Sequence, residues 1–196
     1  MLKGTLAALT GALCLLAFNS AQAFGDDGYT PGTTRLTVDA GLSGGGDKLA
    51  TIIYTNGDTQ TIYAGDGLFG DFGVQQNLAD TDWSLKATLG FDYWAVNASN
   101  ATTTFTRYPL DLLAIYSIGR NHIGFGVTEH FSPRLDLDGF GPNVSFNNAT
   151  GVMLQYQYWL FGVRLTSIRY TASGNCTGGC GTVSGNSLGV FFNYAF

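Results

Sequence analysis

Ser187-Leu-Gly-Val-Phe-Phe-Asn-Tyr-Ala-Phe196 closes the chain, and its alternation decides the fold class. Counting back from Phe196, every second residue is apolar, and the positions between are small or polar except for Phe191. A period of two is typical of a β-strand with one apolar face. We therefore expect a C-terminal strand that places Phe192, Tyr194 and Phe196 on the same face.

Seven further segments alternate in the same way, and most have about the 9–11 residues that a tilted strand needs to cross a bilayer. They cover residues 35–42, 68–78, 83–95, 104–118, 122–131, 149–158 and 161–170. Only 12% of the residues are charged, against about 25% in soluble domains. This composition favours a membrane barrel over the alternative, a soluble β-sandwich.

The connections between these segments alternate in length, which is a separate indication of the fold. Short connections fall at 79–82, 119–121 and 159–160, and long ones at 43–67, 96–103, 132–148 and 171–186. Outer-membrane barrels have short periplasmic turns and long external loops. The sequence therefore predicts an all-β fold, an eight-stranded antiparallel up-and-down transmembrane β-barrel with both termini on the periplasmic side.

The first external loop contains the pattern of an extra hairpin. Two β-prone runs, 51–54 and 60–63, flank Asn56-Gly57-Asp58, a strong hairpin turn signal. The hairpin either extends the wall above the membrane or supplies a ninth and a tenth barrel strand.

The N-terminal 23 residues have the pattern of a secretory signal peptide. Lys3 precedes an apolar run at 6–18, and Ala21-Gln22-Ala23 is a cleavage pattern. We expect residues 1–23 to be removed and residues 24–196 to form the barrel. In an exported chain, Cys176 and Cys180 predict a disulfide.

Charged residues fall on the strand face opposite to the apolar one, and thus in the predicted lumen. They are four cations and four anions: Arg35, Asp39, Asp71, Lys86, Asp92, Arg107, Asp111 and Arg164. An eight-stranded barrel is just wide enough for side chains to fill, and buried charges need partners. We expect a filled, salt-bridged lumen, with a narrow channel for small solutes as the alternative. Pro109 cannot donate to a sheet ladder, which predicts a bulge in its strand.

Aromatic residues near the strand ends predict two girdles at the membrane interfaces. The periplasmic girdle would contain Trp83, Tyr116, Tyr158, Trp159 and Phe196. The outer girdle would contain Tyr93, Trp94, Tyr108 and Phe131.

No motif in the chain satisfies the requirements of a catalytic, cofactor or metal site. Residues 65–70 match G-x-G-x-x-G, but a strand follows where a dinucleotide site needs a helix. Asp136 and Asp138 are too few for a calcium loop. His130 and Ser132 are the one candidate base and nucleophile, and alternation places both in the lumen. We predict no enzyme, no cofactor and no metal.

Several of these features resemble known families. The C-terminal aromatic strand resembles the assembly signal of bacterial outer-membrane barrels, and the architecture resembles barrels of the outer membrane protein A and X type. Arg107-Tyr-Pro109 and residues 124–127 look like uncharacterised proteobacterial outer-membrane β-barrel proteins. His130-Phe-Ser132 is similar to lipid A 3-O-deacylases, which implies a lipid A-modifying acyl hydrolase as a second alternative, although Pro133-Arg-Leu135 departs from that family's pattern.

These resemblances imply a monomer in the bacterial outer membrane, with a structural or surface-interaction role. Its expected partners are outer-membrane lipid, lipopolysaccharide and the barrel assembly machinery. Nucleic acid is not expected, because the net charge of −5 provides no basic footprint.

Overall fold

A computed structural model describes residues 30–53, 57, 59–97, 102–138, 142–173 and 181–196. These residues form strands β1 (Thr34–Gly44), β2 (Lys48–Ile53), β3 (Thr59–Tyr63), β4 (Gly67–Asn77), β5 (Trp83–Asn97), β6 (Thr102–Ile118), β7 (Asn121–Leu137), β8 (Val144–Ser145), β9 (Ala149–Tyr158), β10 (Phe161–Ser167), β11 (Arg169–Thr171), β12 (Thr182–Ser184) and β13 (Ser187–Ala195). The described part of the chain has no helix long and apolar enough to cross a membrane.

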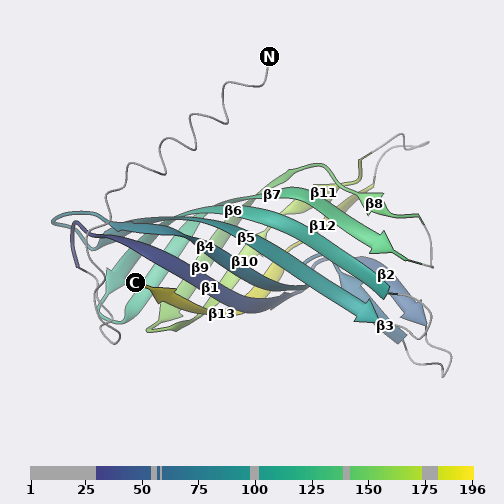
Figure 1. Ribbon diagram of the computed structural model, residues 1–196, viewed down its shortest axis with the longest axis horizontal. Helices are drawn as coiled ribbons and strands as arrows, with labels where there is room; N and C mark the ends of the chain where they lie inside the picture. The colour runs from purple at the N-terminus through teal and green to yellow at the C-terminus, as the bar shows by residue number, and fades with distance from the viewer. Residues whose placement is uncertain (1–29, 54–56, 58, 98–101, 139–141, 174–180) are drawn as a thin grey trace, which may run out of the picture.

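Eight strands close into an antiparallel barrel (Figure 1). Their order is β6-β5-β4-β1-β13-β10-β9-β7, and pairing between β6 and β7 closes the ring. Each ring strand pairs with the ring strands before and after it in the chain, while β1 and β13 pair with each other. The predicted eight-stranded up-and-down barrel is confirmed. β8 lies outside the ring and pairs with β7.

The two ends of the barrel differ, as the connection lengths predict. One end, here called the turn end, carries the short turns β4–β5, β6–β7 and β9–β10. The backbone amide of Leu36 donates to the carbonyl of Phe196 there, so both ends of the described barrel meet at this edge. Each short turn contains one residue with φ of 56°: Asp80, Gly119 or Trp159. The opposite, loop end carries the long connections.

The expected hairpin between the first two barrel strands is present. β2 and β3 pair antiparallel, with Thr51 opposite Thr61, and form a sheet of their own. They are therefore not a ninth and a tenth barrel strand. Figure 1 shows the hairpin at the end of the molecule away from the C-terminus.

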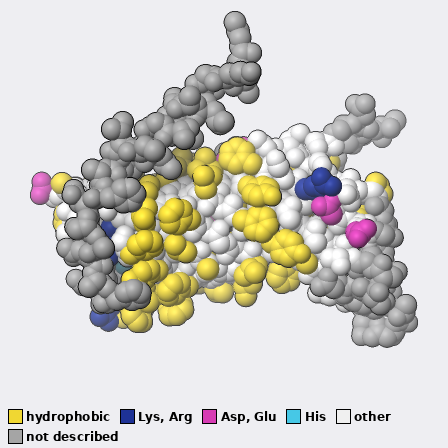
Figure 2. All heavy atoms as spheres, in the orientation of Figure 1, with side chains coloured by type: hydrophobic (Ala, Val, Ile, Leu, Met, Phe, Trp, Pro, Cys, Tyr) yellow, Lys and Arg dark blue, Asp and Glu magenta, His cyan; other side chains and the backbone are white. Residues whose placement is uncertain are grey.

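An apolar belt surrounds the barrel wall, because each of the eight ring strands places exposed apolar side chains on its outer face. Its members include Val38, Leu42, Leu68, Phe72, Leu85, Leu89, Phe91, Tyr108, Leu112, Ile123, Phe125, Val127, Val152, Leu154, Tyr156, Val163, Leu165, Leu188, Val190 and Phe192. Figure 2 shows hydrophobic side chains gathered on the wall in view, and charged ones towards its two ends.

The loop end has its own apolar core, here called the cap core. It consists of Ile62, Ala64, Val96, Phe105, Leu135, Phe146, Ala149, Ile168 and Tyr170. These residues come from the hairpin and the residue after it, from the loop-end parts of β5, β6, β7 and β9, and from the segments beside β8 and β11. Trp94 packs against this core. Its assignment to an outer aromatic girdle was wrong, because its strand position faces inward at the loop end.

The bulge was predicted in the strand of Pro109, β6, but the extra residue lies in the neighbouring strand β7. Pro109 keeps regular register opposite His130, whereas the register shifts between Thr106 and Tyr108, opposite Ser132 of β7. Ser132 has a φ of 48°, in the left-handed region. The extra residue reverses the inward and outward alternation of β7 beyond this point.

Candidate functional site: the interior of the barrel

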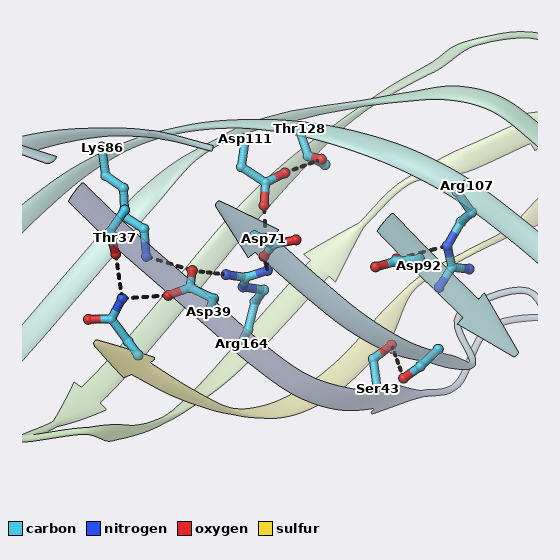
Figure 3. A network of polar contacts seen from close by, with 12 residues as sticks. Thr37, Asp39, Ser43, Asp71, Lys86, Asp92, Arg107, Asp111, Thr128 and Arg164 are labelled. Carbon is cyan, nitrogen blue, oxygen red and sulfur yellow. Dashed lines mark hydrogen bonds and ion pairs between the residues drawn. The ribbon is translucent and has the colours of Figure 1, made fainter. Parts of the chain in front are cut away.

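The inward positions of the ring strands gather seven of the eight predicted lumen charges. Buried side chains include Asp39, Asp71, Lys86, Asp92, Arg107, Asp111 and Arg164. Arg35 also takes an inward position, next to the turn end, and is half-buried. The buried charges form two groups that occupy different heights of the barrel (Figure 3).

Arg164 is the centre of the first group, here called the Arg164 cluster. From β10 its Nη2 lies 3.1 Å from Asp39 Oδ2 on β1, and its Nη1 lies 3.0 Å from Asp71 Oδ2 on β4. The same Nη1 lies 3.4 Å from Asp111 Oδ2 on β6. One guanidinium therefore ties together four strands across the lumen.

Aromatic rings hold the same guanidinium in place. The Arg164 guanidinium carbon lies 4.9 Å from the ring centroid of Phe69 and 5.2 Å from that of Phe191. Stacking against aromatic faces suits a planar guanidinium more than a lysine ammonium. The arrangement therefore requires arginine at this position rather than any cation.

Asp39 extends the cluster towards the turn end. Lys86 Nζ lies 2.6 Å from Asp39 Oδ2. Asn193 donates from Nδ2 to Asp39 Oδ1 and to Thr37 Oγ1, and Gln157 donates to Asn193 Oδ1 at 3.2 Å. Both carboxylate oxygens of Asp39 are thus bonded, which is the condition for keeping a buried carboxylate ionised.

Arg107 forms the second group with Asp92, here called the Arg107 cluster. Its Nε lies 2.9 Å from Asp92 Oδ2, Nη1 donates to the carbonyl of Ala64, and Nη2 donates to the carbonyl of Asp66 at 2.9 Å. Those carbonyls lie between β3 and β4, at the base of the hairpin. A Cβ atom on Gly67 would come within 2.7 Å of Nη2, so glycine permits this approach. Arg107 of β6 therefore links the base of the β2–β3 hairpin to the barrel wall through these two hydrogen bonds.

A cavity of about 30 Å³ separates the two clusters. Asp111 and Arg164 of the first cluster and Asp92 and Arg107 of the second line it. This volume admits water, and it is far smaller than pockets that enclose organic ligands. The space between the two clusters is therefore small, and it is lined by apolar side chains such as Phe69 and Met153 as well as by charged ones.

His130 and Ser132 do not form a catalytic pair. His130 is buried on the inner face, and its Nδ1 lies 2.7 Å from the hydroxyl of Tyr170. Ser132 is exposed on the outer face, because the bulge turns it away from the lumen. The expectation that both residues face the lumen was wrong for Ser132.

Tyr170 joins the cap core to the barrel wall. It is fully buried, and this burial raises the pKa of Tyr170 to about 12. The hydroxyl therefore stays protonated at neutral pH and is available for the hydrogen bond with His130. Tyr170 lies on β11, which is not one of the ring strands.

The sequence analysis assigned only charged residues to the lumen, and it missed several polar residues that hydrogen-bond to them. Thr128 donates to Asp111 at 2.6 Å, Asn193 donates to Asp39, and Gln157 donates to Asn193. Their signal was present, since each is a polar residue at an inward position of a ring strand. Leu113, Ile115 and Met153 form a small apolar cluster in the same lumen.

The remaining predicted residues lie away from this site. Phe192 belongs to the belt, and Tyr194 stacks on Phe196 with ring centroids 5.9 Å apart. Asp136 pairs with Arg134 at 2.7 Å, and the residues that the structure describes contain no group of three potential metal ligands. Cys176, Cys180 and residues 1–23 lie outside the described residues.

The interior cross-links ring strands through its ion pairs, and at the turn end the hydroxyl of Ser117 lies 2.9 Å from Nδ1 of His122. Comparison of the sequence with known proteins finds no matching family model and no matching curated protein.

Proposed function

We propose that the protein is an integral barrel of the bacterial outer membrane, closed to solutes, whose role is structural or depends on contacts made at its loop end. The single observation that carries this proposal is the combination of an apolar belt on all eight ring strands with charges inside them. A contiguous apolar surface of this extent is unfavourable in water. A bilayer of outer-membrane lipid and lipopolysaccharide is the environment that would cover it.

The inversion of polarity along β6 supports the same reading. Towards the loop end, Thr104 and Thr106 face outward while Phe105 is buried inside. Beyond Arg107 the pattern reverses, and the outward side chains become Tyr108 and Leu112. We take this reversal as the edge of the hydrocarbon layer on the external side.

Electrophoresis of membrane fractions tests membrane insertion. Expressed with its own residues 1–23, the protein should fractionate with the outer membrane, and its band should shift when the sample is boiled. Protease added to intact cells should cut only at the loop end. A protein recovered in the soluble periplasm without a heat-dependent shift would overturn the proposal, and would indicate that the belt is covered by something other than lipid.

A narrow channel is the second candidate, and the cavity between the two clusters is the observation that favours it. We expect purified wild-type barrel to be silent in planar bilayers, because Arg164 crosses the lumen to three carboxylates. Regular single-channel steps from the wild-type protein, abolished by a barrel-blocking crosslink, would favour the channel instead. A hydrolase is not favoured, because His130 and Ser132 lie on opposite faces.

A further inference from the structure

We propose that the outer wall of β6 and β7, at the loop-end edge of the apolar belt, binds the phosphate-bearing end of a lipopolysaccharide molecule. Arg134 and Tyr108 donate to the phosphate, and Glu129 shares a divalent cation with it. The inference rests on the proposed insertion in the outer membrane, because it needs the loop end to face the external leaflet. It names the lipid partner and the part of the wall that holds it.

Glu129 is an acidic side chain on the outer face of the wall. It lies on β7, two residues beyond Val127 of the belt and opposite Thr150 of β9. Thr150 donates to its Oε2, and within the described part of the chain the carboxyl group has no second hydrogen-bond partner. Ionisable groups on a spanning segment are costly, and they point to a site whose partner carries the opposite charge. Glu129 therefore indicates a cation at the edge of the hydrocarbon layer.

The bulge in β7 brings Arg134 to the same face as Glu129. Residues five apart on a regular strand point to opposite sides of a sheet. The extra residue at Ser132, with φ of 48°, turns Arg134 to the outer face, where 52% of its side chain is exposed. The Ser132 amide donates to Asn148 Oδ1 at 3.1 Å, which holds the bulge in place. Bulges re-aim side chains next to functional sites, and here the re-aimed side chain is a cation.

Arg134 and Tyr108 have donors left for an anion. Nε of Arg134 donates to Asp136 Oδ1 at 2.7 Å, whereas neither Nη atom has a partner among the residues that the structure describes. The hydroxyl of Tyr108, a side chain that is 49% exposed, also has no partner there. Tyr108 lies opposite Phe131, and thus between the levels of Glu129 and Arg134 on the wall. The fork of an arginine matches the oxygens of a phosphate, and the phenol adds one more donor.

A phosphate with a divalent counterion satisfies all three groups. A phosphate alone would be repelled by Glu129 and Asp136, while a hard divalent cation takes oxygen ligands from a carboxylate and a phosphate together. The phosphates of lipopolysaccharide lie between its acyl chains and its sugars. The wall changes at the same height, from Leu112 on the outer face of β6 to Thr106 towards the loop end. Acyl chains below the phosphate would then cover Leu112 and Val127.

Titration with lipopolysaccharide tests the site. The full chain, expressed with its own residues 1–23 and purified from membranes, is placed in vesicles of phosphatidylethanolamine and phosphatidylglycerol. Lipopolysaccharide truncated to its inner core is then added in the presence of Mg²⁺. A lipid that binds the folded barrel raises the temperature at which the folded gel band converts to the unfolded one. We expect a rise of several degrees in the wild type, and removal of most of this rise by EDTA.

Glu129→Gln and Arg134→Gln are the decisive variants, and Arg169→Gln is the matched control. In each decisive variant, the amount of lipopolysaccharide that gives half of the rise should increase about tenfold or more, because one contact to a charged group is lost. EDTA should affect Glu129→Gln less than the wild type, since the carboxyl ligand of the cation is gone. Arg169 is an exposed cation on β11, which does not pair with β6 or β7, so its variant should behave like the wild type.

Equal responses of the wild type and the two decisive variants to lipopolysaccharide would overturn this inference and leave membrane insertion intact. The same rise in vesicles without lipopolysaccharide, produced by more phosphatidylglycerol, would overturn it as well. A heat-dependent band shift in each protein shows separately that the barrel has inserted. If a variant does not insert, the wild type still decides the question, because a rise that EDTA leaves unchanged would exclude the bridging cation.

Discussion

The middle of the barrel and its loop end are built on the same strands but have opposite interiors. In the middle, the wall is apolar outside, and Arg164 and its carboxyl partners lie inside. At the loop end, threonine and charged side chains face outward, and Phe105, Leu135 and Tyr170 form the cap core inside. Along β6 the period of two continues, while the apolar side chains change from the inner face, at Phe105, to the outer face, at Leu112.

The two interiors also differ in how they hold the strands together. The cap core gains stability from apolar burial, which depends weakly on orientation. The Arg164 cluster depends on directed contacts, and its charges are tolerated only while every partner is present. Removal of Arg164 from its cluster should therefore lower the free energy of unfolding more than removal of one side chain from the cap core.

Arg164→Ala should have the largest effect. It would leave Asp39, Asp71 and Asp111 without their shared cation, and breaking a buried ion pair costs about 3–5 kcal/mol. Unfolding by urea in detergent or lipid measures the loss. Arg134→Ala is the control, because the Arg134–Asp136 pair is exposed and such pairs contribute about 0.2–1 kcal/mol. Equal losses in the two variants would contradict the assignment of Arg164 as the main cross-link.

Arg107→Ala should have the next largest effect and should act at the loop end. It removes the partner of Asp92 and the hydrogen bonds to the carbonyls of Ala64 and Asp66, a loss of about 3 kcal/mol. We expect faster proteolysis around residues 45–66, with a destabilised barrel rather than loss of a specific activity. Arg107→Lys retains the charge but not the fork of donors, so it should lie between the wild type and Arg107→Ala. Unchanged proteolysis and an unchanged melting temperature in Arg107→Ala would show that the hairpin is held by its apolar contacts alone.

The ring, its turns and its inward charges followed from local pattern, because strand alternation and turn length are properties of short segments. The partners of Arg164 did not, because the choice among carboxyl groups on β1, β4 and β6 depends on the stagger between strands that are distant in sequence. Alternation also counts Arg35 equally with the other charges, although the barrel leaves it half-buried near the turn end.

Two incorrect expectations have a common physical origin. Trp94 was assigned to the outer girdle because aromatic residues near strand ends usually face lipid, yet polarity inverts at the loop end and Trp94 packs against the cap core. Ser132 was assigned to the lumen because an uninterrupted strand was assumed, yet a residue with φ of 48° reverses the alternation there. Both errors lie where the barrel wall passes from the middle region to the cap.

Tyr170→Phe should have the smallest effect, and it probes the contact that joins the two regions. The aromatic ring of residue 170 and its packing are retained, while the hydrogen bond to His130 Nδ1 is lost, at a cost of about 1 kcal/mol.

Because burial raises the pKa of Tyr170 to about 12, above the ordinary value near 10, the folded state retains a proton that the unfolded state loses between these pH values. Stability of the wild-type cap should therefore fall as pH rises from about 10 to 12, and that component should be missing in Tyr170→Phe. Hydrogen exchange at the backbone amides of β11 and β12 follows the cap separately from the ring. If the wild type and Tyr170→Phe lost the same stability between pH 10 and 12, the ionisation of another group would account for the loss. Arg107, rather than Tyr170, would then be the main contact between the barrel wall and the cap core.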